Sequence, residues 1–322
     1  MNYAKSYHSA QLGFTLIELM ISLVLGLLIS AAVIQVYIIN TRTLTIQQGA
    51  SEVQDSAIFA LQPLEEHIRI ANLGNPITSI TNTTNHGGIV LSAANLGSSN
   101  DTDAQYFTNS AGDSSLSNTD VNSDQLTIQY KNITPNTLYD CEGGEIPDDS
   151  SWVVERYFLR LATGASATPA IKDLVLACDA GRVDDTGAVV KSTNSEGAET
   201  SSTFSGNGSV IAPAVDQFQV LLGTQTSIDT LTYLSASEYL SLAAADKPAI
   251  TTVKIGFIVR SNTPLITDTD TSQFNLFGQS QELKASTDTR KKYYRRSYES
   301  TILLRNARVM SVTATAESVV PQ

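Results

Sequence analysis

The feature that most constrains this chain is an apolar run from Phe14 to Ile39, in which Glu18 is the only ionisable residue apart from Tyr37. As an α-helix this run is about 39 Å long, which is enough to cross a hydrocarbon core of roughly 30 Å. A cleaved signal peptide fits poorly, because its apolar stretch usually holds only about 7–15 residues. An uncleaved signal anchor is compatible with the hydropathy alone, and the flanking Lys5 and Arg42 give little charge bias to orient it.

Glu18 is unusual because a carboxylate inside an apolar helix costs a few kcal/mol to insert, so we expect it to have a function and a partner. No basic side chain lies between Gln11 and Phe14. If the chain were cut between Gly13 and Phe14, the new α-amine of Phe14 would lie four residues from Glu18, within helical reach. The sequence therefore predicts that an amine created by cleavage, in the same or a neighbouring copy, pairs with Glu18.

Composition excludes several classes of function. The chain has 322 residues, with 20 Lys+Arg against 32 Asp+Glu and a formal charge of −12, which argues against general nucleic-acid binding. Two cysteines cannot form a four-thiolate metal site, and three histidines leave little material for a histidine-based centre. No nucleophile–base pair or glycine-rich phosphate loop is visible. We therefore expect no catalysis, no cofactor and no metal.

Helical periodicity continues beyond Ile39, with apolar residues mostly three or four positions apart. The expected stripe comprises Leu44, Ile46, Ala50, Val53, Ala57, Ile58, Leu61, Leu64 and Ile68. Pro63 is expected to kink this helix, or to end it and start another. The segment Asn72-Leu73-Gly74-Asn75-Pro76 is typical of a helix stop. Residues 77–125 are rich in Asn, Thr, Ser and Gly, and we expect long loops there with one or two strands.

The rest of the chain favours a mainly antiparallel sheet, because short apolar or alternating segments are separated by Gly/Asn/Ser-rich connections. A short helix is expected from Ser235 to Ala245, where Ser235 and Glu238 form a capping-box pattern. The expected strands are 126–130, 152–161, 174–178, 215–222, 253–259 and 298–304.

The segment Gly13-Phe14-Thr15-Leu16-Ile17-Glu18, followed by the apolar run, resembles the processing site of type IV pilins and related pseudopilins. The resemblance implies that a prepilin peptidase cuts after Gly13 and methylates the new N-terminal Phe14, while Glu18 helps each helix dock into a growing filament. It also implies an α+β, pilin-like fold in which a long N-terminal helix packs on a mainly antiparallel sheet. The implied parts are a leader (1–13), a transmembrane half-helix (14–39), an amphipathic half-helix (40–73) and a periplasmic β-rich head (74–322).

Three later stretches resemble PilW-type minor pilins, namely Ala214–Gly223, Thr252–Ser261 and Arg295–Asn306. The resemblance implies a low-copy subunit of the pilus tip that primes assembly and supports a PilY-type tip adhesin, in adhesion, twitching motility and conceivably DNA uptake. Its partners would be other minor pilins, the major pilin and the prepilin peptidase. It would be a single-pass inner-membrane protein with a periplasmic head before assembly, and would lie at the pilus tip on the cell surface afterwards.

Two other functions fit the same residues. A J-type pseudopilin of type II secretion would share the processing and a similar fold. A signal-anchored surface adhesin or receptor would keep its first residues uncleaved and bind a ligand directly through its β-rich head.

Cys141 and Cys178 both follow the apolar run. If the pilin resemblance places them in the periplasm, a disulfide is expected, because that compartment is oxidising. Two free thiols in a reducing compartment are the alternative.

Two further motifs have ordinary interpretations that we favour. The segment Lys284–Arg308 holds eight basic residues around Tyr293 and Tyr294, a mixture that can bind nucleic acid, but the acidic chain favours a solvated strand or a patch facing an acidic partner. The pairs Asp101/Asp103 and Asp268/Asp270 could bind calcium, but they lack the glycine and distal glutamate of an EF-hand loop, which favours Asp-rich turns. His67 and His86 have no evident catalytic partner and are expected to be structural.

Overall fold

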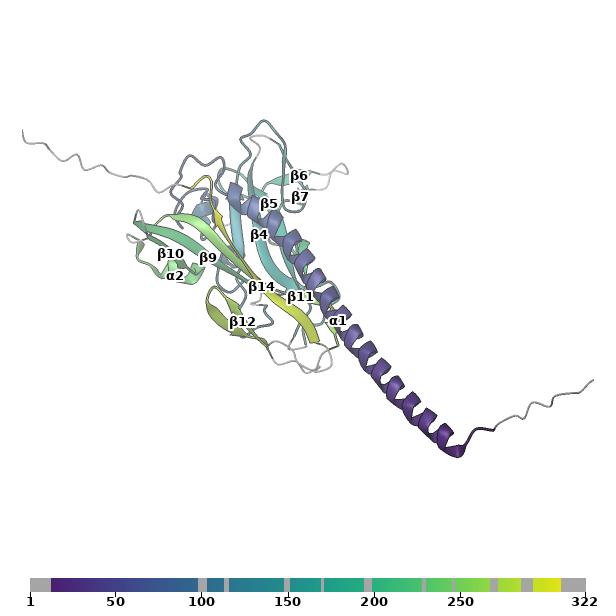
Figure 1. Cartoon of the computed structure of the whole chain (residues 1–322). Coiled ribbons are helices and arrows are strands. Elements are labelled where there is room, and N and C mark those ends of the chain that lie inside the picture. Colours follow the sequence, from purple (N-terminus) through teal and green to yellow (C-terminus); the bar gives the residue numbers. More distant parts are fainter. Residues whose placement is uncertain are drawn as a thin grey trace, which may run out of the picture.

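The computed structural model describes residues 13–97, 103–112, 116–147, 151–168, 171–193, 199–227, 230–244, 247–266, 272–284 and 292–307. One long helix, α1 (Leu16–Ile70), projects from a β-rich head, and only its second half lies against that head (Figure 1). The fold is therefore α+β, with a long N-terminal helix packed on antiparallel sheets, as the sequence predicts.

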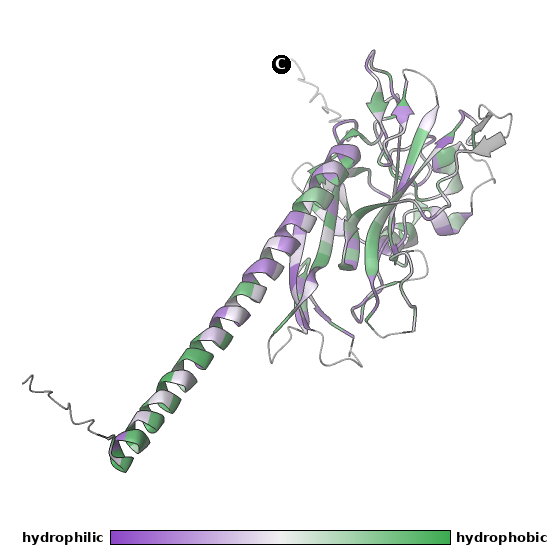
Figure 2. Cartoon of the chain, turned by 90° about the vertical axis from the view of Figure 1, so that its right-hand side faces the viewer, coloured by the Kyte–Doolittle hydropathy of each residue, from purple (hydrophilic) through white to green (hydrophobic). Residues whose placement is uncertain are grey.

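The two halves of α1 have different surroundings. Every residue from Gly13 to Asn40 is exposed, and this half is mostly hydrophobic (Figure 2). Burial begins at Gly49, against which the side chains of Leu265 and Tyr294 pack closely. From there one stripe faces the head, with the buried residues Gly49, Val53, Ala57, Ala60, Leu64 and Ile68.

The predicted stripe is partly wrong. Leu44 and Ile46 precede the head, and both are exposed. Ile58 is also exposed, because it is turned by about 100° from Ala57 and points away from the sheets. The expectation that Pro63 ends the helix is wrong as well, since α1 continues through it. Because Pro63 has no backbone N–H, the carbonyl of Phe59, four residues earlier, lacks its helical donor. Phe59 is 73% exposed, so water can hydrate that carbonyl.

Two four-stranded antiparallel sheets form the head, where the sequence predicts a single sheet. The first has the order β1 (Leu126–Tyr130), β4 (Trp152–Leu161), β5 (Leu174–Val183) and β8 (Ser209–Pro213). The second has the order β10 (Thr230–Leu234), β9 (Val215–Ser227), β11 (Ile250–Leu265) and β14 (Lys292–Leu303). Helix α1 packs mainly on β11 and β14. Three short hairpins complete the β structure: β2 (Leu138–Tyr139) with β3 (Glu145–Ile146), β6 (Lys191–Thr193) with β7 (Glu199–Ser201), and β12 (Gln273–Leu276) with β13 (Gln279–Glu282).

A single main core lies between α1 and the inner faces of both sheets. Leu64 and Ile68 of α1 join Val153 and Tyr157 of β4 in it, together with Phe257 of β11. The opposite face of the first sheet is also covered, by a smaller cluster that includes Trp152, Val154 and Phe204. Strand β4 is consequently buried on both faces from Trp152 to Leu159, and its charged residues Glu155 and Arg156 are fully buried.

The predicted strands exist; β1 and β4 have the expected bounds, and the other four are longer than expected. The prediction of one or two strands within residues 77–125 is wrong for the described residues. That segment contains two short 3₁₀ helices, η1 (Ala93–Leu96) and η2 (Ala104–Tyr106), and single bridges such as the one from Ile89 to Ile128 of β1. Several of its apolar residues are buried, among them Ile89, which bridges β1 of the first sheet, and Ile80, which bridges Ile250 of β11. Helix α2 (Ala236–Ser241) has the predicted capping box but ends before Ala245, because Leu242 takes an extended backbone.

Candidate functional site

The start of α1 is the first candidate site. Gly13 and Phe14 precede the helix, Phe14 is 90% exposed, and a Cβ built on Gly13 would meet no atom within 4 Å. The peptide bond between them is therefore accessible. Thr15 is the N-cap of α1, and its hydroxyl accepts a hydrogen bond from the Glu18 N–H at 3.3 Å. In return Glu18 Oε2 accepts from the Thr15 N–H at 3.2 Å and from its hydroxyl at 3.0 Å.

This reciprocal arrangement is a capping box, and the sequence prediction missed it. The pattern Thr15-x-x-Glu18 in front of an apolar run could have shown it. The box satisfies backbone donors at the helix start, and the negative carboxylate suits the positive end of the helix dipole. Hydrogen bonds from Thr15 do not neutralise the charge, and within the described residues no ion pair of Glu18 is found.

The exposed half of α1 is the only helix among the described residues that is long and apolar enough to cross a membrane. The hydroxyls of Ser22, Thr41 and Thr43 each donate a hydrogen bond to the carbonyl four residues earlier. Their hydroxyl protons therefore need no partner outside the helix. Glu18 lies within this half, in its first turn.

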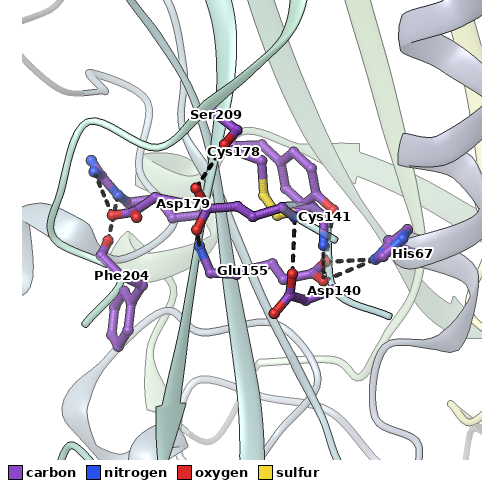
Figure 3. Close-up of a disulfide and its surroundings, with 12 residues drawn as sticks. His67, Asp140, Cys141, Glu155, Cys178, Asp179, Phe204 and Ser209 are labelled. Carbon is purple, nitrogen blue, oxygen red and sulfur yellow. Dashed lines mark hydrogen bonds and ion pairs between the residues drawn. A yellow bond between two sulfur atoms is a disulfide. The ribbon is translucent and has the colours of Figure 1, made fainter. Parts of the chain in front are cut away.

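The second candidate site surrounds a disulfide in the head (Figure 3). Cys141 and Cys178 are bonded, as expected for an oxidising compartment, and their Cα atoms lie 6.2 Å apart. Below the disulfide lies Glu155, which is fully buried. Its Oε1 accepts from Tyr130 at 2.8 Å and from the Cys141 N–H at 3.0 Å, and its Oε2 accepts from Tyr157 at 2.7 Å.

His67 of α1 completes this cluster, with Nδ1 2.9 Å from both carboxylate oxygens of Glu155. Burial of the imidazole would lower its pKa, but the hydrogen bond and negative charge of Glu155, followed by the charges of Asp140 and Glu66, raise the pKa of His67 overall. His67 is structural, as expected, but it joins the helix to the first sheet through a buried charge that the sequence did not reveal.

The basic segment of β14 is partly internal. Arg295 Nε donates to the fully buried Asp216 at 2.7 Å, and Arg260 of β11 pairs with the same carboxylate. Both guanidinium groups also contact the ring of Tyr293, whose centroid lies 4.8 Å from that of Arg260 and 5.6 Å from that of Arg295. Lys284 donates to a backbone carbonyl. These contacts support a structural strand over a DNA-binding one, and the absence of nucleic-acid binding stays a prediction.

Other predicted positions fall partly outside the described residues, namely Asp101, Asp268, Asp270, Arg290, Lys291 and Arg308. Asp103 caps η2 through a bond from the Gln105 N–H, as expected for an Asp-rich turn. His86 is stacked on Trp152 with ring centroids 4.3 Å apart, which is a structural contact. No cluster of three metal-binding side chains occurs in the part of the chain that the structure describes.

Comparison with known proteins gives two sequence matches. The model for type IV pilus-assembly protein W matches residues 182–306, and the model for the prokaryotic N-terminal methylation motif matches residues 8–34. The first match contains all three PilW-like stretches, and it also covers 182–210, where the sequence shows no recognisable motif. The second contains Gly13, Phe14 and Glu18. No curated protein matches the chain.

Among solved structures, a type IV-like pilin from Thermus thermophilus is similar at 9% sequence identity, over 79% of this chain and 97% of that one, with a TM-score of 0.36. That likeness is too low to support a functional comparison. The N-terminal match contains the accessible Gly13–Phe14 bond, and the later match contains all four strands of the second sheet. The chain therefore carries a prokaryotic N-terminal methylation motif at residues 8–34 and, at residues 182–306, a segment similar to type IV pilus-assembly protein W.

Proposed function

We propose that this protein is a minor pilin of the pilus tip, processed between Gly13 and Phe14 and assembled through Glu18. The observation that carries this proposal is the arrangement at the start of α1, where an accessible bond precedes the Glu18 carboxylate, which has hydrogen-bond partners but, among the described residues, no counter-charge. Cleavage creates an amine on Phe14, four residues before Glu18, and leaves the Thr15 cap in place because Thr15 lies after the cut. The amine, in the same or a neighbouring copy, then supplies the missing positive charge.

The parts of the chain follow from this proposal. Residues 1–13 are the leader, residues 14–39 hold the subunit in the inner membrane, residues 40–73 carry the amphipathic half of the helix, and 74–322 form a periplasmic head. The exposed first half of α1 and the disulfide in the head support this order, because one needs an apolar surrounding and the other an oxidising compartment. In the filament the same apolar helix surface packs against other pilins instead of lipid.

As a PilW-type subunit the protein would act with other minor pilins to prime assembly and to support a PilY-type adhesin, and no step requires catalysis. Adhesion and twitching motility depend on this role, and a contribution to DNA uptake would be indirect. Processing requires the prepilin peptidase, and the major pilin extends the filament below the tip.

Two substitutions test the proposal in cells that lack the native copy. Glu18→Ala removes the charge and should abolish or sharply reduce surface piliation, whereas Ser22→Ala, one turn further along the same exposed helix, should leave it normal. Gly13→Val should block processing without disturbing the fold, because nothing surrounds Gly13. Normal piliation in both the Glu18→Ala and Gly13→Val strains would refute the proposal. A defect in protein secretion with normal twitching would instead favour the J-type pseudopilin.

A further inference from the structure

The Glu155 carboxylate is the most completely enclosed acidic group of the disulfide cluster, and four separate segments meet at it. Tyr130 comes from β1, Tyr157 from β4 itself, the Cys141 amide from the turn between β2 and β3, and His67 from the last turn of α1. All of these contacts are between 2.7 and 3.0 Å. Glu155 thus joins α1 to the first sheet, on which α1 otherwise has few direct contacts.

The hydrogen-bond pattern defines the charge state of the cluster. Burial, followed by the charge of Glu155, raises the pKa of both Tyr130 and Tyr157, so both hydroxyls remain protonated and donate. The Cys141 amide can only donate. Glu155 therefore accepts with both oxygens, which is the behaviour of a carboxylate. A buried carboxylate without a positive partner is costly, and His67 is the group placed to supply that charge.

The other groups around His67 act in the same direction or are already paired. Asp140 belongs to the turn that carries Cys141, and it forms an ion pair with Arg182 of β5. Glu66 precedes His67 on α1, and both acidic groups favour the protonated imidazole. The position of His67 in the last turn of α1 favours a cation as well, because the C-terminal end of a helix is negative.

The disulfide determines where the Cys141 amide lies. Cys178 is in β5 and is paired in register with Tyr157 of β4, which is two residues from Glu155 along the strand. The bond to Cys178 holds the turn over Glu155 and excludes water from it. Two other contacts also attach this turn to β5: the Asp140–Arg182 pair and the bond from the Ala180 N–H to Glu142 at 3.0 Å. The turn should therefore stay folded without the disulfide, but be less firmly held.

We propose that the disulfide and the His67–Glu155 pair form one coupled latch between α1 and the head. The latch is closed when Cys141 and Cys178 are oxidised and His67 is protonated. Reduction, or a pH above the pKa of His67, weakens the attachment of the last turn of α1 to β4. The conditions that the latch would experience rest on the proposed function, because a periplasmic head lies in an oxidising compartment whose pH follows that of the medium. The latch itself is a property of the folded chain.

Histidine titration by NMR tests the latch on the full processed chain in detergent micelles. Cleavage of the leader removes His8, so His67 and His86 are the histidines that remain in the processed chain. In the oxidised protein His67 should titrate above the ordinary value of about 6.5. In the Cys141→Ala/Cys178→Ala variant its midpoint should fall by roughly half a pH unit or more, about a threefold loss of proton affinity, because water reaches Glu155. The chemical shifts of His86, which stacks on Trp152, report whether the variant is folded and serve as an internal control.

Each other outcome contradicts part of the latch. A His67 midpoint at or below about 6.5 in the oxidised protein would refute the ion pair. An unchanged or higher midpoint in the variant, with His86 unmoved, would refute the coupling to the disulfide. If the His86 signal shows that the variant is unfolded, oxidised Glu155→Gln decides. His67 should then titrate below its ordinary value, because burial is opposed only by the charges of Asp140 and Glu66, and a midpoint still above that value would refute the proposal. None of these results depends on whether the protein assembles into pili.

Discussion

The contrast between the two halves of α1 leads to a quantitative prediction for Leu64→Ala. Leu64 is fully buried between α1 and the two sheets. Removing such a side chain from a packed core costs about 3–5 kcal/mol, from lost burial and from the cavity left behind. With a urea dependence of about 3 kcal/mol per molar for a head of this size, the unfolding midpoint should fall by roughly 1 M or more.

Leu28→Ala is the matched control, because Leu28 is 63% exposed and lies in the half of α1 that has no contact with the head. Its urea midpoint should equal that of the wild type. The assay is far-UV circular dichroism of the full chain in detergent micelles across a urea series, with Trp152 fluorescence as a second probe. Equal midpoints for Leu64→Ala and wild type would show that α1 is not part of the core of the head. An equal fall in the urea midpoint of both variants would show that the two halves of α1 contribute equally to the stability of the head.

Three further predictions concern the head. Burial raises the pKa of Asp124 to about 7, so the folded state favours its neutral form, and the free energy of unfolding should fall from about pH 4 to pH 7 and level off above. In Asp124→Asn the urea midpoint should depend less on pH over this range, and an unchanged pH dependence would contradict the assignment. Reducing the Cys141–Cys178 bond, whose partners are 37 residues apart, should lower stability by roughly 3–4 kcal/mol on the chain-entropy model, and a midpoint unaffected by reductant would argue against it. Gly88→Ala should prevent folding, because the new Cβ would lie 2.4 Å from the backbone nitrogen of Asn72; a native dichroism spectrum would contradict that clash.

Local patterns predicted the elements of this fold well. The apolar run and the later periodicity indicated one long helix, alternation located β1 and β11, and a run of aromatic and β-branched residues located β4. The register of α1 on the head was harder, because it depends on where the head begins. Burial starts at Gly49, where Tyr294 comes close, and that contact joins residues far apart in the sequence.

The polar interior of the head could not be predicted for a related physical reason. Strand β4 carries Glu155 and Arg156 side by side, and in a strand exposed on one face one of them would reach water. Here both are buried, since the main core formed with α1 and the second sheet covers one face of the first sheet, and the 77–125 segment helps to cover the other. Their partners, such as His67 and Asp179, come from distant segments. The Thr15–Glu18 and Ser235–Glu238 capping boxes, by contrast, each lie within four residues of sequence.

The most direct test of the central claim is the intact mass and N-terminal sequence of the protein purified from assembled pili. If the counter-charge of Glu18 is created by proteolysis, the chain begins at Phe14 with one added methyl group. A protein that still carries Met1 while occurring in pili at its normal level would contradict this claim, because Glu18 would then enter the filament without the amine that is expected to neutralise it.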